Sequence, residues 1–475
     1  MTVVYLITAF LIATGLFINR NRGVNYLLLA LFMTLQWGFT LYACLHFRNV
    51  ENGYFSFDAL GLLLLCTLSF IAVPAAIHGW LYIERHQETG SSRVIYFAAL
   101  TLLITAIGAG YLANHIAVIW IFTEITTLSA SALIYHHRNK LALEGTWKYV
   151  FICAISITFV FIGILFLHLS LISAGSSDLS FSNLLENSSK LDPFWLRFAL
   201  LFIFTGFTAK MGLVPMFTAG IDAKDKAPAP AGALLSSVLM NLGFVGIFRF
   251  YTVIANTPIH QWANLVMGTA AFLTIFVAAV YMVKVKNVKR MLAYSSLEHM
   301  GLVMIGIIAG GIGYYAALLH LILHALVKSG LFFQYNQLYR VFQDKSTYSI
   351  GNYFKYNPAG AIVLLFGFVS LTAIPPSGMF VSELMIFRSL FEAGNLWLLL
   401  AVLLLLTIIL YAFGKNMMKI LFIPVSTLNE AAIPRISPWE SVTQYVLIFA
   451  AIWLGLNPPA EFADLIRESI HLLPR

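Results

Sequence analysis

Fourteen long apolar stretches fill most of the chain, and only short polar segments separate them. Each stretch has the roughly 20 residues that a helix needs to cross the hydrocarbon core of a membrane. The stretches are too long and too continuously apolar for the alternating strands of a membrane barrel. The pattern therefore predicts an all-α, polytopic membrane protein with helices near residues 2–19, 25–46, 58–84, 94–112, 115–135, 148–173, 196–217, 229–254, 262–283, 291–309, 312–338, 359–391, 396–424 and 440–457.

Composition agrees with a lipid environment. Hydrophobic residues make up 60% of the 475 residues and charged residues only 10%, and the mean hydropathy is +0.86. No soluble core needs so much apolar surface, and the predicted spans leave no room for a soluble domain. The three cysteines, Cys44, Cys66 and Cys153, lie in apolar stretches without a CxxC motif. We therefore expect small packing residues there and no iron–sulfur cluster in this chain.

The distribution of basic residues predicts the orientation. Of the 28 Lys and Arg residues, 17 fall in the loops on one side of the predicted spans and 5 on the other. Basic residues are retained on the cytoplasmic side. The pattern therefore predicts that both termini lie outside, and it explains the net charge of +8 without a nucleic-acid partner.

An acid and a base occur within predicted spans. Glu124 lies near the middle of the span at 115–135, and Lys210 lies just before Pro215 in the span at 196–217. Each such group costs about 2.5 to 3.5 kcal/mol at mid-membrane, so it indicates a function by default. A structural ion pair is one interpretation. The other is a pair that opens and closes, switching Lys210 between proton acceptor and donor.

His320, His324 and Lys328 follow one another at intervals of four residues. On a helix this spacing places them on one face, each about 6 Å further along the axis. Histidine exchanges protons near neutral pH, and water can bridge gaps of this size. We interpret the row as a proton wire rather than a zinc site, because no third and fourth ligand are evident beside it and Lys328 repels a dication.

Prolines are expected to interrupt two spans, one at Pro215 and one in the segment Ala373-Ile-Pro-Pro-Ser-Gly. Broken helices in corresponding positions of two halves are typical of transporters built from inverted repeats. Glu124 and Glu298 are 174 residues apart, and Lys210 and Glu383 are 173 apart, which supports a repeat weakly. We predict one integral membrane domain over 1–475, with N-terminal helices in 1–90, five-helix repeats in 94–254 and 262–424, and a C-terminal helix and tail in 440–475.

These motifs together resemble the antiporter-like subunits shared by respiratory complex I, multisubunit sodium/proton antiporters and membrane-bound hydrogenases. The resemblance covers about residues 60 to 430. Asp222-Ala-Lys-Asp-Lys-Ala-Pro is similar to the loop D-A-H-x-x-A-P that follows the broken seventh helix, and Lys286 to Gly301 is similar to the tenth-helix signature. The segment Ser-Ser-Leu-Glu-His-Met-Gly resembles most the hydrogenase-4, or formate hydrogenlyase, branch.

The resemblance implies roles for individual residues. Protons from the cytoplasm would load Lys210, held by Glu124, and pass near Asn241 to the row at 320–328. They would leave past Glu383. Secondary candidates are Lys148, Glu298 and His299.

Two departures from the family pattern matter. Asn241 stands where relatives often have a lysine, and it can hold water but cannot carry the proton. Lys224 replaces the histidine of the loop, which argues against proton uptake through histidines there.

The implied function is proton translocation in a redox-driven, complex I-like assembly, most similar to a hydrogenase-linked one in a bacterial or archaeal cytoplasmic membrane. The partners would be other membrane subunits and a peripheral cytoplasmic redox module. Iron–sulfur clusters and a NiFe or quinone site are expected only in those partners, and this chain is expected to hold no cofactor or metal. Two alternatives stay open: a cation/proton antiporter or ion-coupled uptake subunit without redox chemistry, and an inactive structural subunit.

Overall fold

The computed structural model describes residues 1–51, 53–88, 90–425 and 433–474, and these are almost entirely helical. The chain forms two compact units. The first comprises Met1–Ala231, Val238–Met267 and Glu461–Arg475, and the second comprises Gly232–Ser237 and Gly268–Ala460. The predicted all-α fold class is confirmed, with one small difference. The two-residue strands β1 (Val50–Glu51) and β2 (Phe55–Ser56) form an antiparallel pair, with Val50 opposite Ser56.

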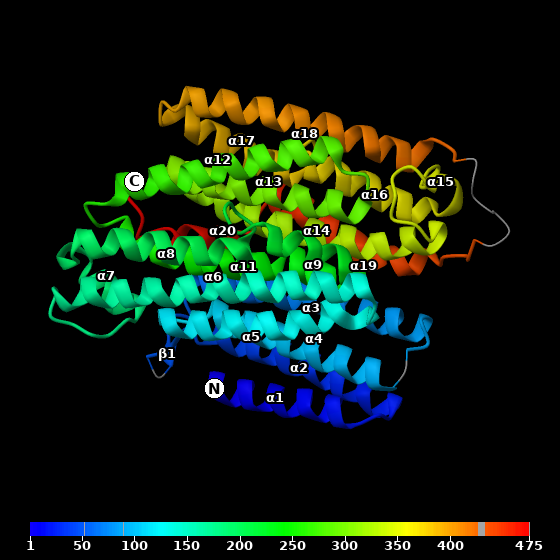
Figure 1. Cartoon of the computed structure of the whole chain (residues 1–475), viewed down its shortest axis with the longest axis horizontal. Helices are drawn as coiled ribbons and strands as arrows, with labels where there is room; N and C mark the ends of the chain where they lie inside the picture. Colours follow the sequence, from blue (N-terminus) through cyan, green and yellow to red (C-terminus); the bar gives the residue numbers. More distant parts are fainter. Residues whose placement is uncertain (52, 89, 426–432, 475) are drawn as a thin grey trace. The chain divides into compact units, whose positions relative to one another are not determined.

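The first unit contains most of the N-terminal helices, and within it the long helices run nearly aligned (Figure 1). Its elements are α1 (Thr2–Ile18), α2 (Arg22–Leu45), α3 (Ala59–Arg85), α4 (Gly90–Tyr111), α5 (Ile116–Ile134), η1 (Tyr135–His137), α6 (Lys140–Ile172), α7 (Phe181–Glu186), η2 (Ser188–Lys190), α8 (Pro193–Met211), α9 (Thr218–Lys226), α11 (Val238–Ile254) and α20 (Ala460–Ser469).

The second unit contains α13 (Val288–Ala309), α14 (Ile312–Phe342), α15 (Tyr353–Tyr356), α16 (Pro358–Leu371), α17 (Gly378–Glu392), α18 (Leu396–Phe422), η4 (Pro438–Ser441) and α19 (Val442–Leu456). Three helices are divided between the units: α10 (Ala229–Ser236), α12 (His260–Lys284) and α20, whose first residue, Ala460, belongs to the second unit. The predicted inverted repeats and the boundaries given for them stay predictions.

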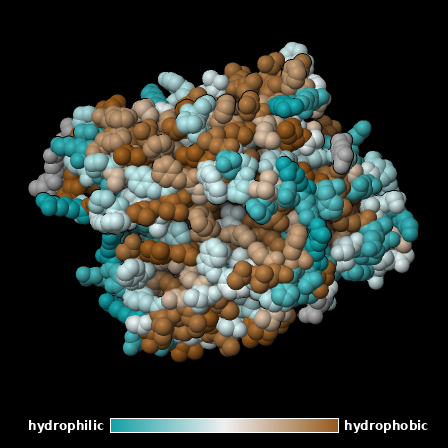
Figure 2. Space-filling view, turned by 180° about the vertical axis from the view of Figure 1, so that it is seen from behind, coloured by the Kyte–Doolittle hydropathy of each residue, from teal (hydrophilic) through white to brown (hydrophobic). Residues whose placement is uncertain are grey.

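Twelve helices of the described residues are long and apolar enough to cross a membrane, and two shorter apolar ones are α1 and α16. Each of the fourteen predicted spans overlaps one of these helices. Large hydrophobic side chains are exposed along them, for example Trp397 at 87% and Leu404 at 64% on α18. Figure 2 shows hydrophobic residues over wide areas of the visible face. So much exposed apolar surface suits contact with lipid, and the chain is a multi-pass membrane protein.

The first predicted helix break lies where α8 ends. Gly212 follows the helix with φ 84°, a left-handed conformation that glycine adopts without strain, and its N–H donates to the carbonyl of Thr208. The chain then turns through Pro215 and resumes in α9 at Thr218. The break is confirmed, but α8 ends at Met211, four residues before Pro215. Gly212, and not the proline, ends the helix.

The second predicted break separates α16 from α17. α16 ends at Leu371, and Ala373 has φ 47°. α17 begins at Gly378 after the N-cap Ser377, whose side chain accepts a hydrogen bond from the N–H of Phe380. The predicted continuous range 359–391 is therefore two helices, as its prolines indicated.

Small residues allow α6, α8 and α11 to approach closely within the first unit, where α6 and α8 run side by side (Figure 1). A Cβ atom on Gly206 of α8 would lie 2.5 Å from the carbonyl oxygen of Ser156 on α6. A Cβ atom on Gly243 of α11 would lie 2.4 Å from the backbone nitrogen of Met211. Only glycine fits at either position, and this contact fixes the end of α8 that carries Lys210.

Replacing Gly243 by alanine should therefore destabilise the protein. The added methyl group meets backbone atoms that cannot rotate away, so we expect a loss of about 1 to 3 kcal/mol in the free energy of unfolding. SDS-induced unfolding in mixed micelles measures it. Gly38→Ala on α2 is the matched control because a Cβ atom there has no neighbour within 4 Å. Equal stability of the two variants would contradict the proposed close contact.

Candidate proton-carrying sites

Two neutral oxygens hold Lys210. Its Nζ donates to Thr127 Oγ1 on α5 at 2.8 Å and to Tyr149 Oη on α6 at 2.9 Å. The side chain is only 7% exposed. Lys210 also lies in the last turn of α8, where unpaired carbonyls favour a positive charge. The three helices therefore bury one titratable group with enough polar partners to keep it there.

Glu124 does not form the expected ion pair with Lys210. Among the described residues no salt bridge joins them, and Glu124 Oε2 is buried without a hydrogen-bond partner. Thr127, which does contact Lys210, is three residues further along α5, about 4.5 Å of helical rise. The hydroxyl therefore takes the place that we assigned to the carboxylate, and the pair is separated in this structure.

Lys148 does not face Glu124 either. α6 begins at Lys140 after the N-cap Asn139, eight residues earlier than predicted, so Lys148 is two turns inside the helix. Its side chain is 51% exposed, and its Nζ lies 2.6 Å from a carboxylate oxygen of Glu144 and 3.7 Å from one of Asp222. These two carboxylates, rather than Glu124, are its partners.

Sequence reasoning missed the burial of Lys224, which we counted among the basic residues of a cytoplasmic loop. The side chain is 2% exposed, and its Nζ lies 3.0 Å from Met240 Sδ. A thioether is a weak acceptor. Burial lowers the pKa of Lys224 to about 7. α9, which carries this residue, is not one of the helices long and apolar enough to cross a membrane. The sequence did offer one indication of a special role for Lys224, because it stands where the family loop has a histidine.

Asn241 on α11 lies next to Met240 in the chain and is completely buried. Neither its side-chain nitrogen nor its oxygen has a hydrogen-bond partner among the described residues. A buried amide without partners is costly, and ordered water is the usual remedy. Asn241 is therefore suited to hold water.

The second unit brings the predicted row together with two further helices. His320, His324 and Lys328 on α14 are all fully buried. His299 on α13, a secondary candidate, lies with its Nδ1 3.1 Å from His320 Nε2. The rings of His299 and His324 have centroids 5.1 Å apart. His299 is thus central to the cluster rather than secondary.

Hydrogen bonds give this cluster a direction. The Ser382 hydroxyl on α17 donates to the carbonyl of Met379, so its oxygen accepts from the Nδ1–H of His320 at 2.9 Å. The Nε2 atom of His320 is then an acceptor, and His299 Nδ1–H donates to it. His299 Nε2 is buried and has no hydrogen-bond partner among the described residues. The histidines therefore form an aligned chain that can pass a proton.

Lys328 is held in the same manner as Lys210. Its Nζ donates to the carbonyl oxygen of Leu292 at 2.8 Å and to the Ser295 hydroxyl, both on α13. Each unit therefore holds one buried lysine on neutral oxygens from a neighbouring helix.

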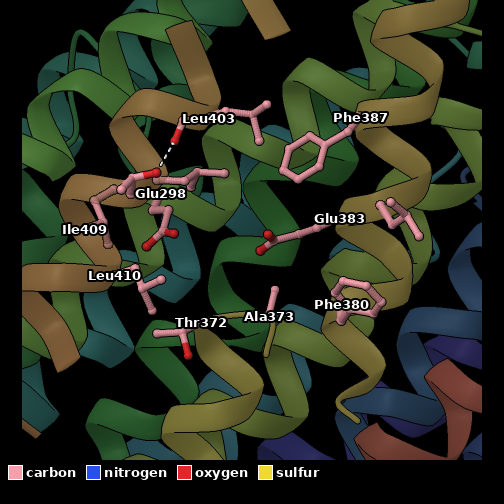
Figure 3. Close-up of a pocket in the computed structure, with 12 residues that line it drawn as sticks. Glu298, Thr372, Ala373, Phe380, Glu383, Phe387, Leu403, Ile409 and Leu410 are labelled. Atoms are coloured by element: carbon pink, nitrogen blue, oxygen red, sulfur yellow. Dashed lines mark hydrogen bonds between the residues drawn. The ribbon is translucent and has the colours of Figure 1, made fainter. Parts of the chain in front are cut away.

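Two carboxylates line a cavity of about 200 Å³ in the second unit. Glu298 on α13 is 5% exposed and Glu383 on α17 is 6% exposed. Figure 3 shows both carboxylate groups pointing into the cavity, with Phe380 and Phe387 on the side of α17. The volume is sufficient for several waters, because one water needs only about 10 to 15 Å³ by this kind of measure. Glu298, a secondary candidate, therefore shares a cavity with the predicted exit residue Glu383.

Lysines, histidines and carboxylates buried in apolar helices define the class of protein: a membrane protein whose interior carries protons or other cations. The family model described as "NADH:quinone oxidoreductase/Mrp antiporter, TM" matches residues 113–409, more than half of the chain. The chain belongs to this family.

One relative is the "Hydrogenase-4 component F homolog" of Methylacidiphilum infernorum (isolate V4), 26% identical over 357 residues, which cover 74% of this chain and 75% of the relative. Two solved structures share the fold. A chain of the membrane-bound sulfane sulfur reductase, an archaeal respiratory membrane complex, matches with a TM-score of 0.84 and 20% identity over 99% of this chain and 96% of that one. A chain of the Mrp complex from Dietzia sp. DQ12-45-1b matches with a TM-score of 0.83 and 16% identity over the same shares, 99% and 96%.

Replacing Thr127 by valine should weaken the hold on Lys210. The buried amino group keeps only the Tyr149 hydroxyl, so we expect the free energy of unfolding to fall by about 1 to 3 kcal/mol. SDS-induced unfolding measures the change. Thr158→Val on α6 is the control, because that exposed hydroxyl bonds only to the carbonyl of Ala154. Equal stabilities of the two variants would show that the Thr127 contact contributes nothing.

Proposed function

We propose that this chain is a proton-translocating membrane subunit of a redox-driven, complex I-like assembly, and that the assembly is hydrogenase-linked. Membership of the family supports the transport function. The observation that carries the proposal is the set of titratable groups buried inside the apolar units: Lys210 and Lys328 on neutral oxygens, and His299 hydrogen-bonded to His320. The similarity to a hydrogenase-4 component F homolog supports the hydrogenase link.

In the first unit the proposed route starts at Lys224. With its pKa lowered to about 7, this lysine accepts and releases protons near neutral pH, as a histidine would. Water at Asn241 and the amino group of Lys210 carry the proton further. Glu124, whose buried oxygen lacks a hydrogen-bond partner among the described residues, changes the proton affinity of Lys210 when it approaches.

In the second unit the proposed route runs from Lys328 through His324, His299 and His320 to the cavity of Glu298 and Glu383. The hydrogen bond between His299 and His320 supports transfer between these two rings, and Glu383 lies close to both. The carboxylates and the waters that the cavity can hold then pass the proton to the outside. We propose that the first set of groups delivers its proton to the second set, with water at Asn241 replacing a fixed carrier.

The energy must come from partner subunits. The three cysteines are free thiols, of which Cys44 and Cys66 lie 3.8 Å apart, and three thiols are fewer than the four that an all-cysteine iron–sulfur cluster needs. We therefore propose that a peripheral cytoplasmic module carries out the redox reaction and that other membrane subunits connect it to this chain. Moving one charge against 100 mV costs about 2.3 kcal/mol, which a redox reaction can supply. We propose that both termini lie outside, as the basic loops indicate.

A cation/proton antiporter without redox chemistry is the second candidate. Its support is that the family description names Mrp antiporters and that the fold matches a chain of an Mrp complex. The two functions differ in what drives the proton. Sodium-dependent proton release from vesicles without an electron donor would favour the antiporter. Loss of proton transfer on substitution of Lys210 would argue against an inactive structural subunit.

Replacing Lys210 by methionine should reduce proton transfer to the background leak, because an unbranched side chain of similar length without a proton-binding group remains. The measurement is redox-driven acidification in proteoliposomes that contain the purified assembly. Lys190→Met, at an exposed position in η2, is the control and should behave as wild type. Normal pumping by Lys210→Met in an intact assembly would refute the proposed route.

The pH profile should reveal Lys224. Lys224 takes up a proton below its pKa and releases it above its pKa. The rate of proton translocation should therefore depend on pH with an apparent pKa near 7. Lys224→Met should lose this step together with most of the rate. Lys224→His should restore both, since histidine titrates near pH 6.5. A profile unchanged in Lys224→Met would show that protons enter elsewhere.

A further inference from the structure

Three side chains from three helices of the second unit converge on one point. His299, His320 and Glu383 each offer a ligand atom, and these atoms all lie within 4.8 Å of one another. All three side chains are buried. We propose that they form a binding site for a divalent transition-metal ion, with Zn²⁺ as the best fit. Two imidazoles and one carboxylate are a common three-ligand set for zinc.

The spacing of the two nitrogens suits a tetrahedral ion. His299 Nδ1 and His320 Nε2 are 3.1 Å apart. With Zn–N distances of about 2.0 to 2.1 Å and a tetrahedral angle, two ligand nitrogens are separated by roughly 3.3 Å. The ion therefore takes the place of the proton on His299 Nδ1, which moves to His299 Nε2, and the rings shift by a few tenths of an ångström.

A second hydrogen bond already orients one ligand. His320 Nδ1–H donates to Ser382 Oγ, which is itself fixed by its bond to the Met379 carbonyl. Metal-binding histidines almost always donate their other N–H in this manner, because the bond fixes the tautomer and the ring. Ser382 therefore leaves the His320 Nε2 lone pair directed at the site.

The surroundings also balance the charge. Glu298 faces the same cavity as Glu383, so two carboxylates can neutralise one dication (Figure 3). The fourth ligand is then a water of the cavity or Glu298 itself. Lys328 lies on the same helix as His320, and its Nζ is held by the Leu292 carbonyl and the Ser295 hydroxyl of α13. The further ligand atoms that were not evident beside the α14 row in the sequence come from α13 and α17.

Binding has a consequence that rests on the proposed function. The ion occupies His299 Nδ1 and His320 Nε2, which are the atoms between which the proposed route passes a proton. Zn²⁺ should therefore block proton transfer through the second unit. Binding itself does not depend on that route.

Cobalt tests the site directly, because Co²⁺ takes the place of Zn²⁺ and reports tetrahedral ligands by its visible absorption. The full chain, purified in detergent without a polyhistidine tag and stripped with a chelator, is titrated with Co²⁺ and then with Zn²⁺. We expect one Co²⁺ per chain with tetrahedral absorption, and its displacement by Zn²⁺. His299→Gln and Glu383→Gln should abolish the signal, and Ser382→Ala should weaken binding by about 10- to 100-fold.

His324→Gln is the matched control. This histidine lies on the same helix but outside the three-residue set, so the variant should keep the cobalt spectrum. Only variants with the wild-type elution volume and unfolding temperature are compared. Absence of a tetrahedral spectrum in the wild-type protein, or a spectrum retained in the His299→Gln/Glu383→Gln double variant, overturns the proposal. The cobalt titration does not measure proton flux. If the chain binds no metal ion while the assembly still pumps protons, only the metal site is refuted and the proposed function stands.

Discussion

A lysine amino group surrounded by hydrocarbon has no water to bond to, so the protein itself must supply every partner. Lys210 and Lys328 are both buried, and their amino groups donate to neutral oxygens of neighbouring helices. Hydroxyl and carbonyl oxygens hold the amino group without fixing its charge as strongly as a carboxylate does. Such a lysine can bind a proton and lose it again, which is what a carrier requires.

The helix breaks and the glycine contacts serve this requirement. α8 ends one residue after Lys210 because Gly212 adopts a left-handed conformation, and Gly243 lets α11 approach that end. In the second unit, the break before α17 places Ser382 and Glu383 in the first turns of a helix that contacts the α14 histidines. The two breaks thus bring polar groups at helix ends to the interior, and the continuous α14 adds its own row of buried polar side chains.

Much of this arrangement was predictable from sequence, because hydropathy and helical periodicity are local properties. The spans, the two interruptions and the row from His320 to Lys328 follow from spacing alone. Contacts between side chains of different helices do not follow from spacing. Lys210 contacts Thr127 instead of Glu124, and His299 contacts His320. Both contacts depend on how the helices are rotated against one another.

Lys224 shows a different limit of sequence reasoning. A lysine in a segment between spans is normally placed at the membrane surface, and counting charges treats it so. Its burial against Met240 depends on α9 folding back beside α11, which no local pattern indicates.

We infer that the buried lysines and histidines carry protons through the protein. The most direct measurement is redox-driven proton translocation by the purified assembly in proteoliposomes, with wild-type chain and with Lys328→Met, while electron transfer is followed in the same sample. We expect the Lys328→Met complex to assemble and retain electron transfer but to lose the translocation that depends on this chain. Unchanged translocation at the same rate of electron transfer would contradict it.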